Sequence, residues 1–183
     1  MTLKEKNELM DTMGKKVMFY IDMDGVLAKW EAGCTFERTL EPGYFYSLEV
    51  ENAIKEAIRL LLDNGFNVSL LSAAYMNGIA EVDKDRWLND NDMKDFPRLF
   101  VPCGQNKADF INANKDVLYV LLDDYNFNLK AWKETNKNGA KFMAIKFLNG
   151  INGGGTEWTG RTIYHHSDAE TIANSIVDFA LLA

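Results

Sequence analysis

The sequence predicts an α/β fold in which a mainly parallel sheet is covered by helices on both faces. Short apolar runs rich in β-branched and aromatic residues alternate along the chain with longer segments whose apolar residues recur at helical spacing. Parallel neighbours in a sheet need crossover connections, and these usually contain a helix. The length of 183 residues and the 47% of hydrophobic side chains fit a single domain with its own core, 1–183.

The first elements follow a polar N-terminal stretch that is compatible with a short helix. Lys16–Ile21 (KVMFYI) is a run of strand-forming residues that ends abruptly at Asp22. In Val50–Asn64 the apolar residues recur at helical spacing, and Gly65 follows as the residue that ends the helix. Phe66–Leu71 is predicted as the next strand.

The middle of the chain continues the alternation. Ala80–Asn89 has helical character, and Arg98–Val101 is predicted as a short strand. Asn106–Ala113 is expected to form a short helix. Val117–Leu122 (VLYVLL) is the clearest buried strand, because all its residues are apolar.

The C-terminal part adds three elements. Phe127–Thr135 is predicted as a helix and Ala140–Phe147 as a strand. Ser167–Leu182 is predicted as the final helix, because Ser167 and Glu170 have the spacing of a capping box at its start.

Two segments interrupt this order. Ala28–Glu49 is rich in aromatic residues and is predicted to be a small cap insert at about 28–49. Asn149–Arg161 is rich in glycine, and its stretch Asn152–Gly155 lacks the G-x-x-x-x-G-K-[ST] pattern of a nucleotide-binding loop. The chain contains no internal repeat and no linker.

Charge and cysteine content narrow the classes of function. A net charge of −7 without a basic stripe disfavours a nucleic-acid polymer as partner. The two cysteines, Cys34 and Cys103, have neither disulfide nor zinc spacing, which indicates a reducing compartment. Met1–Lys16 lacks the apolar stretch of a signal peptide, and no segment has the length of a membrane span. We therefore expect a cytoplasmic protein with no membrane partner.

Carboxylates follow two of the predicted strands at the point where each ends. Asp22 and Asp24 come after the first strand, and Asp123 and Asp124 come after Val117–Leu122. Because ligands of open parallel sheets bind outside the carboxyl ends of the strands, we expect these side chains to converge. Clustered carboxylates repel one another unless a cation lies between them, and an all-oxygen set favours Mg²⁺. Since Mg²⁺ commonly also binds phosphate oxygens, the expected partner is a small phosphorylated substrate.

These residues also carry a family resemblance. IDMDGVL at 21–27, Ser72, Lys107 and the pair Asp123 and Asp124 match, in order, the four motifs of the haloacid dehalogenase superfamily. The match covers residues 17 to about 130. The resemblance implies a Rossmann-like sheet with a small cap insert after the first strand, and a phosphatase activity.

The resemblance also implies roles for individual residues. Asp22 would be the nucleophile that forms an aspartyl-phosphate, and Asp24 would protonate the leaving oxygen and then activate water. Ser72 and Lys107 would hold the phosphate, and Gly25 would let the backbone turn close to it.

The implied cofactor is Mg²⁺. Its ligands would be Asp22, the backbone carbonyl of Asp24, and Asp124. Asp123 would support the ion directly or through water.

A closer similarity is to the 5′(3′)-deoxyribonucleotidases, through DMDGVLAKWE, PGYFYSLEV and LLDDY. It implies (deoxy)nucleoside monophosphates as substrates, with Trp30 and Phe45 as substrate-binding residues. From the residues alone, Trp30 is either a platform for a nucleobase or a packing residue of the insert, and the Tyr44–Tyr46 segment has the same two interpretations.

One departure affects the substrate. Only 49 residues separate Asp22 from Ser72, fewer than in the mammalian-type deoxyribonucleotidases, and the missing part would come from the cap. A cap normally encloses the part of the substrate beyond the phosphate, so the alternative function is a general small-molecule phosphatase. A catalytically inert protein that binds a phosphorylated ligand is the third interpretation.

Overall fold

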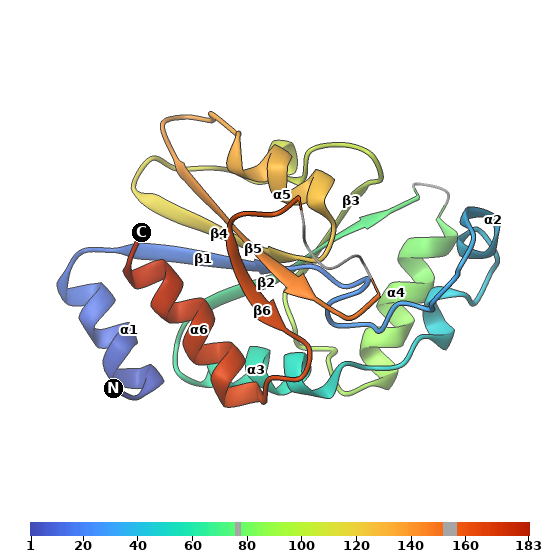
Figure 1. The fold of residues 1–183 in the computed structure, drawn as a ribbon, viewed down its shortest axis with the longest axis horizontal. Coiled ribbons are helices and arrows are strands. Elements are labelled where there is room, and N and C mark those ends of the chain that lie inside the picture. Colours follow the sequence, from blue (N-terminus) through green and yellow to red (C-terminus); the bar gives the residue numbers. More distant parts are fainter. Residues whose placement is uncertain (76–77, 152–156) are drawn as a thin grey trace.

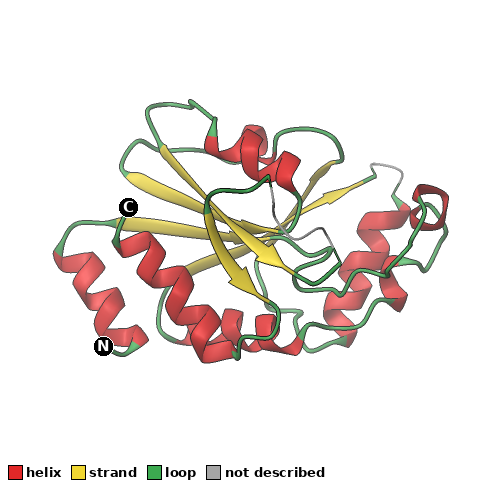
Figure 2. Ribbon diagram, viewed as in Figure 1, coloured by secondary structure: helices red, strands yellow, loops and turns green. Residues whose placement is uncertain are grey.

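The sheet of the protein is entirely parallel. The computed structural model describes residues 1–75, 78–151 and 157–183. Within them, the strands lie in the order β3-β2-β1-β4-β5-β6, and every pair of neighbours is parallel (Figures 1 and 2). This confirms the predicted α/β class. The strands are β1 (Lys16–Ile21), β2 (Asn67–Ala74), β3 (Arg98–Pro102), β4 (Val117–Asp123), β5 (Lys141–Leu148) and β6 (Arg161–Tyr164).

Helices cover both faces of the sheet. One face packs against α1 (Leu3–Thr12), α3 (Asn52–Asp63), α4 (Ile79–Asp90) and α6 (Ala169–Leu181). The other packs against α5 (Asn126–Lys133) and the 3-10 helix η2 (Lys107–Phe110). In Figure 2, α1, α3 and α6 lie below the strands and α5 lies above them.

The alternating pattern of β1 explains this arrangement. Val17, Phe19 and Ile21 point into the core under α3 and α6, whereas Met18 and Tyr20 point to the face of α5. Because β1 and its neighbour β4 lie in the middle of the sheet, both faces of each strand pack against other residues. The carboxyl ends of these two central strands therefore emerge side by side.

The predicted insert, 28–49, is closed at its base. Ala28 forms an antiparallel bridge with Val50, and the Lys29 amide donates to the Glu49 carbonyl at 2.8 Å. The insert contains α2 (Phe36–Thr39) and the 3-10 helix η1 (Phe45–Ser47).

The insert is held against α4 by hydrogen bonds to two side chains that lie about one turn apart on that helix. The Gly43 amide donates to Asp83 at 2.6 Å, and the Trp87 indole donates to the Leu48 carbonyl at 2.7 Å. The insert thus lies beside the carboxyl end of β1.

Three sequence predictions need correction. The strand β6 was missed: Arg161–Tyr164 has four residues and follows a glycine-rich segment, and its pairing with β5 gives it strand structure. The strand predicted to end at Leu71 continues to Ala74, because its register with β3 holds the added residues. The predicted capping box at Ser167 is wrong, since Asp168 is the N-cap and accepts from the Thr171 amide at 2.7 Å.

The other helix boundaries differ by a few residues. Within Asn106–Ala113 only the 3-10 helix η2 forms. Gly65 follows α3 with a φ of 81°, in the position expected for a residue that ends a helix. The glycine-rich stretch Asn152–Gly155 lies outside the described residues. None of the described helices has the length and apolar character needed to cross a bilayer.

Candidate active site

A tight turn follows β1 and holds Asp22 and Asp24. The amides of Val26, Leu27 and Ala28 all donate to the carbonyl of Met23. The side chains of Val26 and Leu27 are fully buried, so they anchor the turn in the core. The backbone around the two carboxylates is therefore fixed by both hydrogen bonds and packing.

Three carboxylates converge at the ends of β1 and β4. Asp22, Asp123 and Asp124 are all buried, and one ligand oxygen from each lies within 4.8 Å of the others. Lys107 lies among them: its ammonium is 2.8 Å from Asp22 Oδ1 and 2.7 Å from Asp123 Oδ2. An oxygen-only set of this size fits a small hard cation such as Mg²⁺.

Asp123 is also engaged by further donors. Its Oδ1 accepts from the Tyr125 amide at 2.8 Å, and its Oδ2 accepts from the Asn128 side chain at 3.0 Å as well as from Lys107. These bonds fix the start of α5 and the position of Lys107. Asp124 is the better candidate for a direct metal ligand, because its side chain lines the open pocket.

Burial perturbs both partners of the central ion pair. It is the main reason why the pKa of Asp22 is raised to about 7; the Asp123 charge adds to this shift, whereas the Lys107 ammonium opposes it. Burial also disfavours the charged form of Lys107, but the Asp123 and Asp22 carboxylates outweigh it and raise the Lys107 pKa above its usual value. The raised pKa of Asp22 means that its charged form is disfavoured in this cluster, and a cation bound among the three carboxylates would stabilise that form.

Asp24 is held by a lysine that the sequence analysis did not identify. The ammonium of Lys84, on α4, is 2.6 Å from Asp24 Oδ2, 2.8 Å from Ser72 Oγ and 2.6 Å from the Ala73 carbonyl. It also lies 4.5 Å from the centroid of the Phe45 ring, within the range of a cation–π contact. Lys84 is 1% exposed, so a buried cation links Asp24 to the end of β2.

A signal for Lys84 was present in the sequence. The buried residues of α4 are Ala80, Lys84, Trp87 and Leu88, which recur at helical spacing. A lysine on the buried stripe of a helix needs a charged or polar partner, and here the partner is Asp24.

Two more polar residues support Asp124. Lys146, on β5, donates to the Asp124 carbonyl at 3.0 Å and to Asn126 Oδ1 at 2.7 Å. Asn149 donates to Asp124 Oδ2 at 2.8 Å and to the Gly25 carbonyl at 3.0 Å. Lys146 interrupts an apolar strand, a pattern that indicates a buried polar contact; Asn149 had no comparable signal.

Gly25 provides space for Asp124. Its φ is 78°, and a Cβ built on it would lie 2.1 Å from Asp124 Oδ2 and 2.6 Å from Asp124 Cγ. Gly25 was predicted to bind phosphate, and that role stays a prediction; the structure shows that the absence of a side chain also leaves room for the Asp124 carboxylate. Any side chain at this position would displace Asp124.

We expect Gly25→Ala to destabilise the protein more than Gly14→Ala does. Both glycines have positive φ, but a Cβ on Gly14 would meet nothing within 4 Å. Overpacking typically costs 1–3 kcal/mol, so the excess loss at Gly25 should be about 1–3 kcal/mol in thermal or urea unfolding. Similar losses for the two variants would contradict a steric role of Gly25.

An open pocket of about 470 Å³ lies over these residues. Of the predicted site residues, Asp22, Asp24, Asp124, Trp30 and Phe45 line it. Ser72, Lys107 and Asp123 are 0–1% exposed, and they contact the lining residues or Lys84 from behind. The pocket is thus acidic at its base, with aromatic side chains around it.

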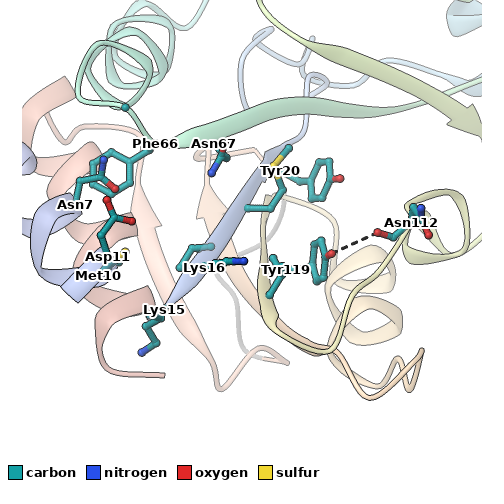
Figure 3. Close-up of a pocket in the computed structure, with 14 residues that line it drawn as sticks. Asn7, Met10, Asp11, Lys15, Lys16, Tyr20, Phe66, Asn67, Asn112 and Tyr119 are labelled. Carbon is teal, nitrogen blue, oxygen red and sulfur yellow. Dashed lines mark hydrogen bonds between the residues drawn. The ribbon is translucent and has the colours of Figure 1, made fainter. Parts of the chain in front are cut away.

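A second hollow, of about 420 Å³, lies at the opposite end of the strands (Figure 3). It is lined by Lys16, Tyr20 and Tyr119, among other residues of α1, β1 and β4. Neither the three clustered carboxylates nor Asp24 lines it. The candidate active site is therefore the pocket over Asp22.

Comparison with known proteins identified no relative of the chain among protein families or curated proteins. The motifs in the sequence and the arrangement of the residues around Asp22 are therefore the features that indicate a function.

Proposed function

We propose that the protein is a Mg²⁺-dependent phosphomonoester hydrolase of the haloacid dehalogenase superfamily, with Asp22 as a covalent nucleophile. The observation that carries the proposal is the position of Asp22. It lies at the end of a central strand, 2.8 Å from the Lys107 ammonium and next to two further buried carboxylates, and it lines an open pocket. These are the features that phosphoryl transfer through an aspartate requires.

The reaction would proceed in two displacements. The Asp22 carboxylate attacks phosphorus, the bond from phosphorus to the ester oxygen breaks, and Asp24 gives that oxygen its proton. Asp24 then takes a proton from water, which attacks the phosphorus of the aspartyl-phosphate and releases Asp22 and inorganic phosphate. Lys84 contacts Oδ2 of Asp24 at 2.6 Å and keeps the side chain in place, so the proton that Asp24 transfers in the first displacement would lie on its other oxygen, Oδ1.

The residues fit a Mg²⁺ ion as the cofactor. Asp22, Asp124 and the backbone carbonyl of Asp24 would hold it, with Asp123 behind them. When bound, the ion would neutralise charge on the phosphoryl oxygens. Lys107 lies close enough to Asp22 to contribute a second positive charge at the same place.

The proposed first substrate class is the (deoxy)nucleoside monophosphates. It is supported by Trp30 and Phe45, which line the pocket beside the carboxylates. The short insert, with only α2 and η1 among its helical segments, favours a general small-molecule phosphatase as the second candidate.

Phosphate release from a panel of monoesters tests the proposal. Wild type should release phosphate from deoxythymidine monophosphate, 2-deoxyribose 5-phosphate and 4-nitrophenyl phosphate with Mg²⁺, and lose this activity in EDTA. A preference for the nucleotide in kcat/KM would favour a nucleotidase, and equal values would favour the general phosphatase. A protein that binds these esters but releases no phosphate would be the inert binding protein.

Trp30→Ala should raise KM for deoxythymidine monophosphate. Trp30 is half-buried at the pocket, and its ring makes an edge contact with Tyr44 at a centroid distance of 6.1 Å. Base stacking is worth roughly 1–3 kcal/mol, which corresponds to an increase of about tenfold to a hundredfold. Trp30→Phe, which keeps a ring, should lose less. Equal losses on 2-deoxyribose 5-phosphate would show that Trp30 only packs against Tyr44.

A further inference from the structure

A second group of aromatic side chains lines the same pocket from a different part of the fold. Tyr125 and Phe127 lie between the end of β4 and the first turn of α5, directly after the Asp123 and Asp124 pair. Their ring centroids are 6.1 Å apart, and both residues line the pocket together with Asp22.

These two rings are exposed although the helix that carries them is well packed. The apolar contacts of α5 with the sheet come from Leu129 and Trp132, which are fully buried. Tyr125 and Phe127 are 59% and 49% exposed and belong to none of the hydrophobic clusters of the described residues. Their rings therefore contribute little to the core, and adjacent exposed aromatic residues at a pocket indicate a binding surface.

The backbone under these rings is fixed by the carboxylate cluster. The Tyr125 amide donates to Asp123 Oδ1 at 2.8 Å, and the Asn128 side chain donates to Asp123 Oδ2 at 3.0 Å. Asp123 in turn contacts Lys107, which contacts the candidate nucleophile, Asp22. The carboxylate cluster at the base of the pocket thus also fixes the backbone segment that carries the two rings, which reduces the entropy lost when that segment binds a ligand.

The two aromatic groups of the pocket come from opposite faces of the sheet. Trp30 and Phe45 belong to the insert, which is hydrogen-bonded to α4, whereas Tyr125 and Phe127 belong to the start of α5 (Figure 1). A planar group that enters the pocket would therefore meet rings from both sides. A substrate group that has only aliphatic carbons and hydroxyls could not stack on the rings of either side.

We propose that Tyr125 and Phe127 form a specificity-determining wall that, with the aromatic residues of the insert, holds a planar aromatic ring of about the size of a nucleobase within the leaving group. This inference rests on the proposed phosphatase function of the same site. It adds two residues at the start of α5 that would favour monoesters with a ring over simple sugar phosphates. Half of the recognition surface would then belong to the core domain rather than to the short insert.

The test compares two substrates that differ only in the base. We measure kcat/KM for deoxythymidine monophosphate and for 2-deoxyribose 5-phosphate with Tyr125→Ala and Phe127→Ala. Stacking predicts losses of about tenfold to a hundredfold on the nucleotide, and losses at least about tenfold smaller on the sugar phosphate. Tyr125→Phe keeps the ring and should stay within about threefold of wild type on the nucleotide.

Two control variants separate stacking from other effects. Phe127→Leu keeps apolar bulk without a ring and should resemble Phe127→Ala in its loss on the nucleotide. Tyr164→Ala removes an aromatic residue that is 49% exposed on β6 and is not part of the pocket lining, so it should preserve the wild-type ratio of the two substrates. Equal losses on both substrates, or no loss on the nucleotide in either alanine variant, would overturn the inference while the phosphatase function stands.

A binding measurement tests the role of Tyr125 and Phe127 even if the protein proves not to be a phosphatase. If wild type hydrolyses neither substrate, the phosphatase proposal fails, and calorimetry with deoxythymidine monophosphate and Mg²⁺ still tests the wall. Weakening of its binding by about tenfold or more in Tyr125→Ala and Phe127→Ala would support the wall. Unchanged affinity, or no binding to wild type, would overturn it.

Discussion

Asp22→Asn should abolish hydrolysis of every phosphomonoester while the protein stays folded. An amide has nearly the shape of a carboxylate but is a poor nucleophile, so kcat/KM should fall by about 10⁴-fold or more. The fold should persist because the Asn side-chain oxygen can still accept from the Met23 amide and from Lys107, as Asp22 Oδ1 does now. Steady-state phosphate release with Mg²⁺ measures the loss, and activity close to that of wild type would contradict a covalent role.

Thermal unfolding of the same variant shows whether lost activity reflects lost structure. Because the pKa of Asp22 is raised to about 7 in the folded protein, protonated Asp22 favours the folded state at low pH. That contribution is lost as the pH rises from about 4 through about 7. In metal-free buffer at about pH 8, the Asn variant, which does not ionise, should therefore have a Tm no lower than that of wild type. A much lower Tm would attribute the lost activity to unfolding.

Asp24→Asn should slow both displacements of a nucleotide. Esters whose leaving groups differ in their need for a proton distinguish the effect on the first displacement from the effect on the second. General acid–base catalysis contributes about 10²- to 10⁴-fold, and the loss on deoxythymidine monophosphate should fall in that range. Nitrophenolate leaves without a proton, so 4-nitrophenyl phosphate should still phosphorylate Asp22. In the second displacement no base accepts a proton from the attacking water, so the aspartyl-phosphate should break down slowly. The variant should therefore release a burst of about one nitrophenolate per enzyme molecule before a slow steady state.

The ion pair of Asp24 makes this variant informative. An Asn side-chain oxygen can accept the hydrogen bond that Lys84 gives to Asp24 Oδ2 at 2.6 Å, so the geometry around the pair should be kept. The loss then reports proton transfer rather than a rearranged Lys84. Equal losses on the two esters with no burst would argue against Asp24 as both the acid and the base.

The sequence was sufficient to predict the carboxylates because the fold places them by simple rules. Asp22, Asp123 and Asp124 come at the ends of apolar runs, and parallel strands bring such ends to one edge of the sheet. No long-range packing had to be known to expect them together. Lys107, by contrast, was indicated by the family resemblance, which assigns it to phosphate binding, and in the structure its ammonium contacts Asp22.

Other features depended on packing that no local pattern reports. Ser72 was expected after a strand, but β2 continues past it because Ser72 and Ala74 are in register with Phe100 and Pro102 of β3. Its hydroxyl is consequently buried and contacts Lys84.

Local sequence patterns also failed to identify two residues that support the site, Lys84 and Asn149. Lys84 was missed because the helical pattern of α4 was read for its apolar residues and not for the charge on its buried stripe. Asn149 reaches Asp124 from a glycine-rich segment without periodicity, so only the folded chain reveals the contact.

The most direct test of the central claim is detection of the phosphoenzyme on Asp22. Wild type is mixed with 4-nitrophenyl phosphate and Mg²⁺, quenched in acid within the first turnovers, and digested for peptide mass spectrometry. The account predicts a phosphoryl group on the peptide that contains Asp22, sensitive to hydroxylamine as an acyl phosphate is, increased in Asp24→Asn and absent in Asp22→Asn. Phosphate release without any such modification, or a phosphoryl group on another residue, would contradict it.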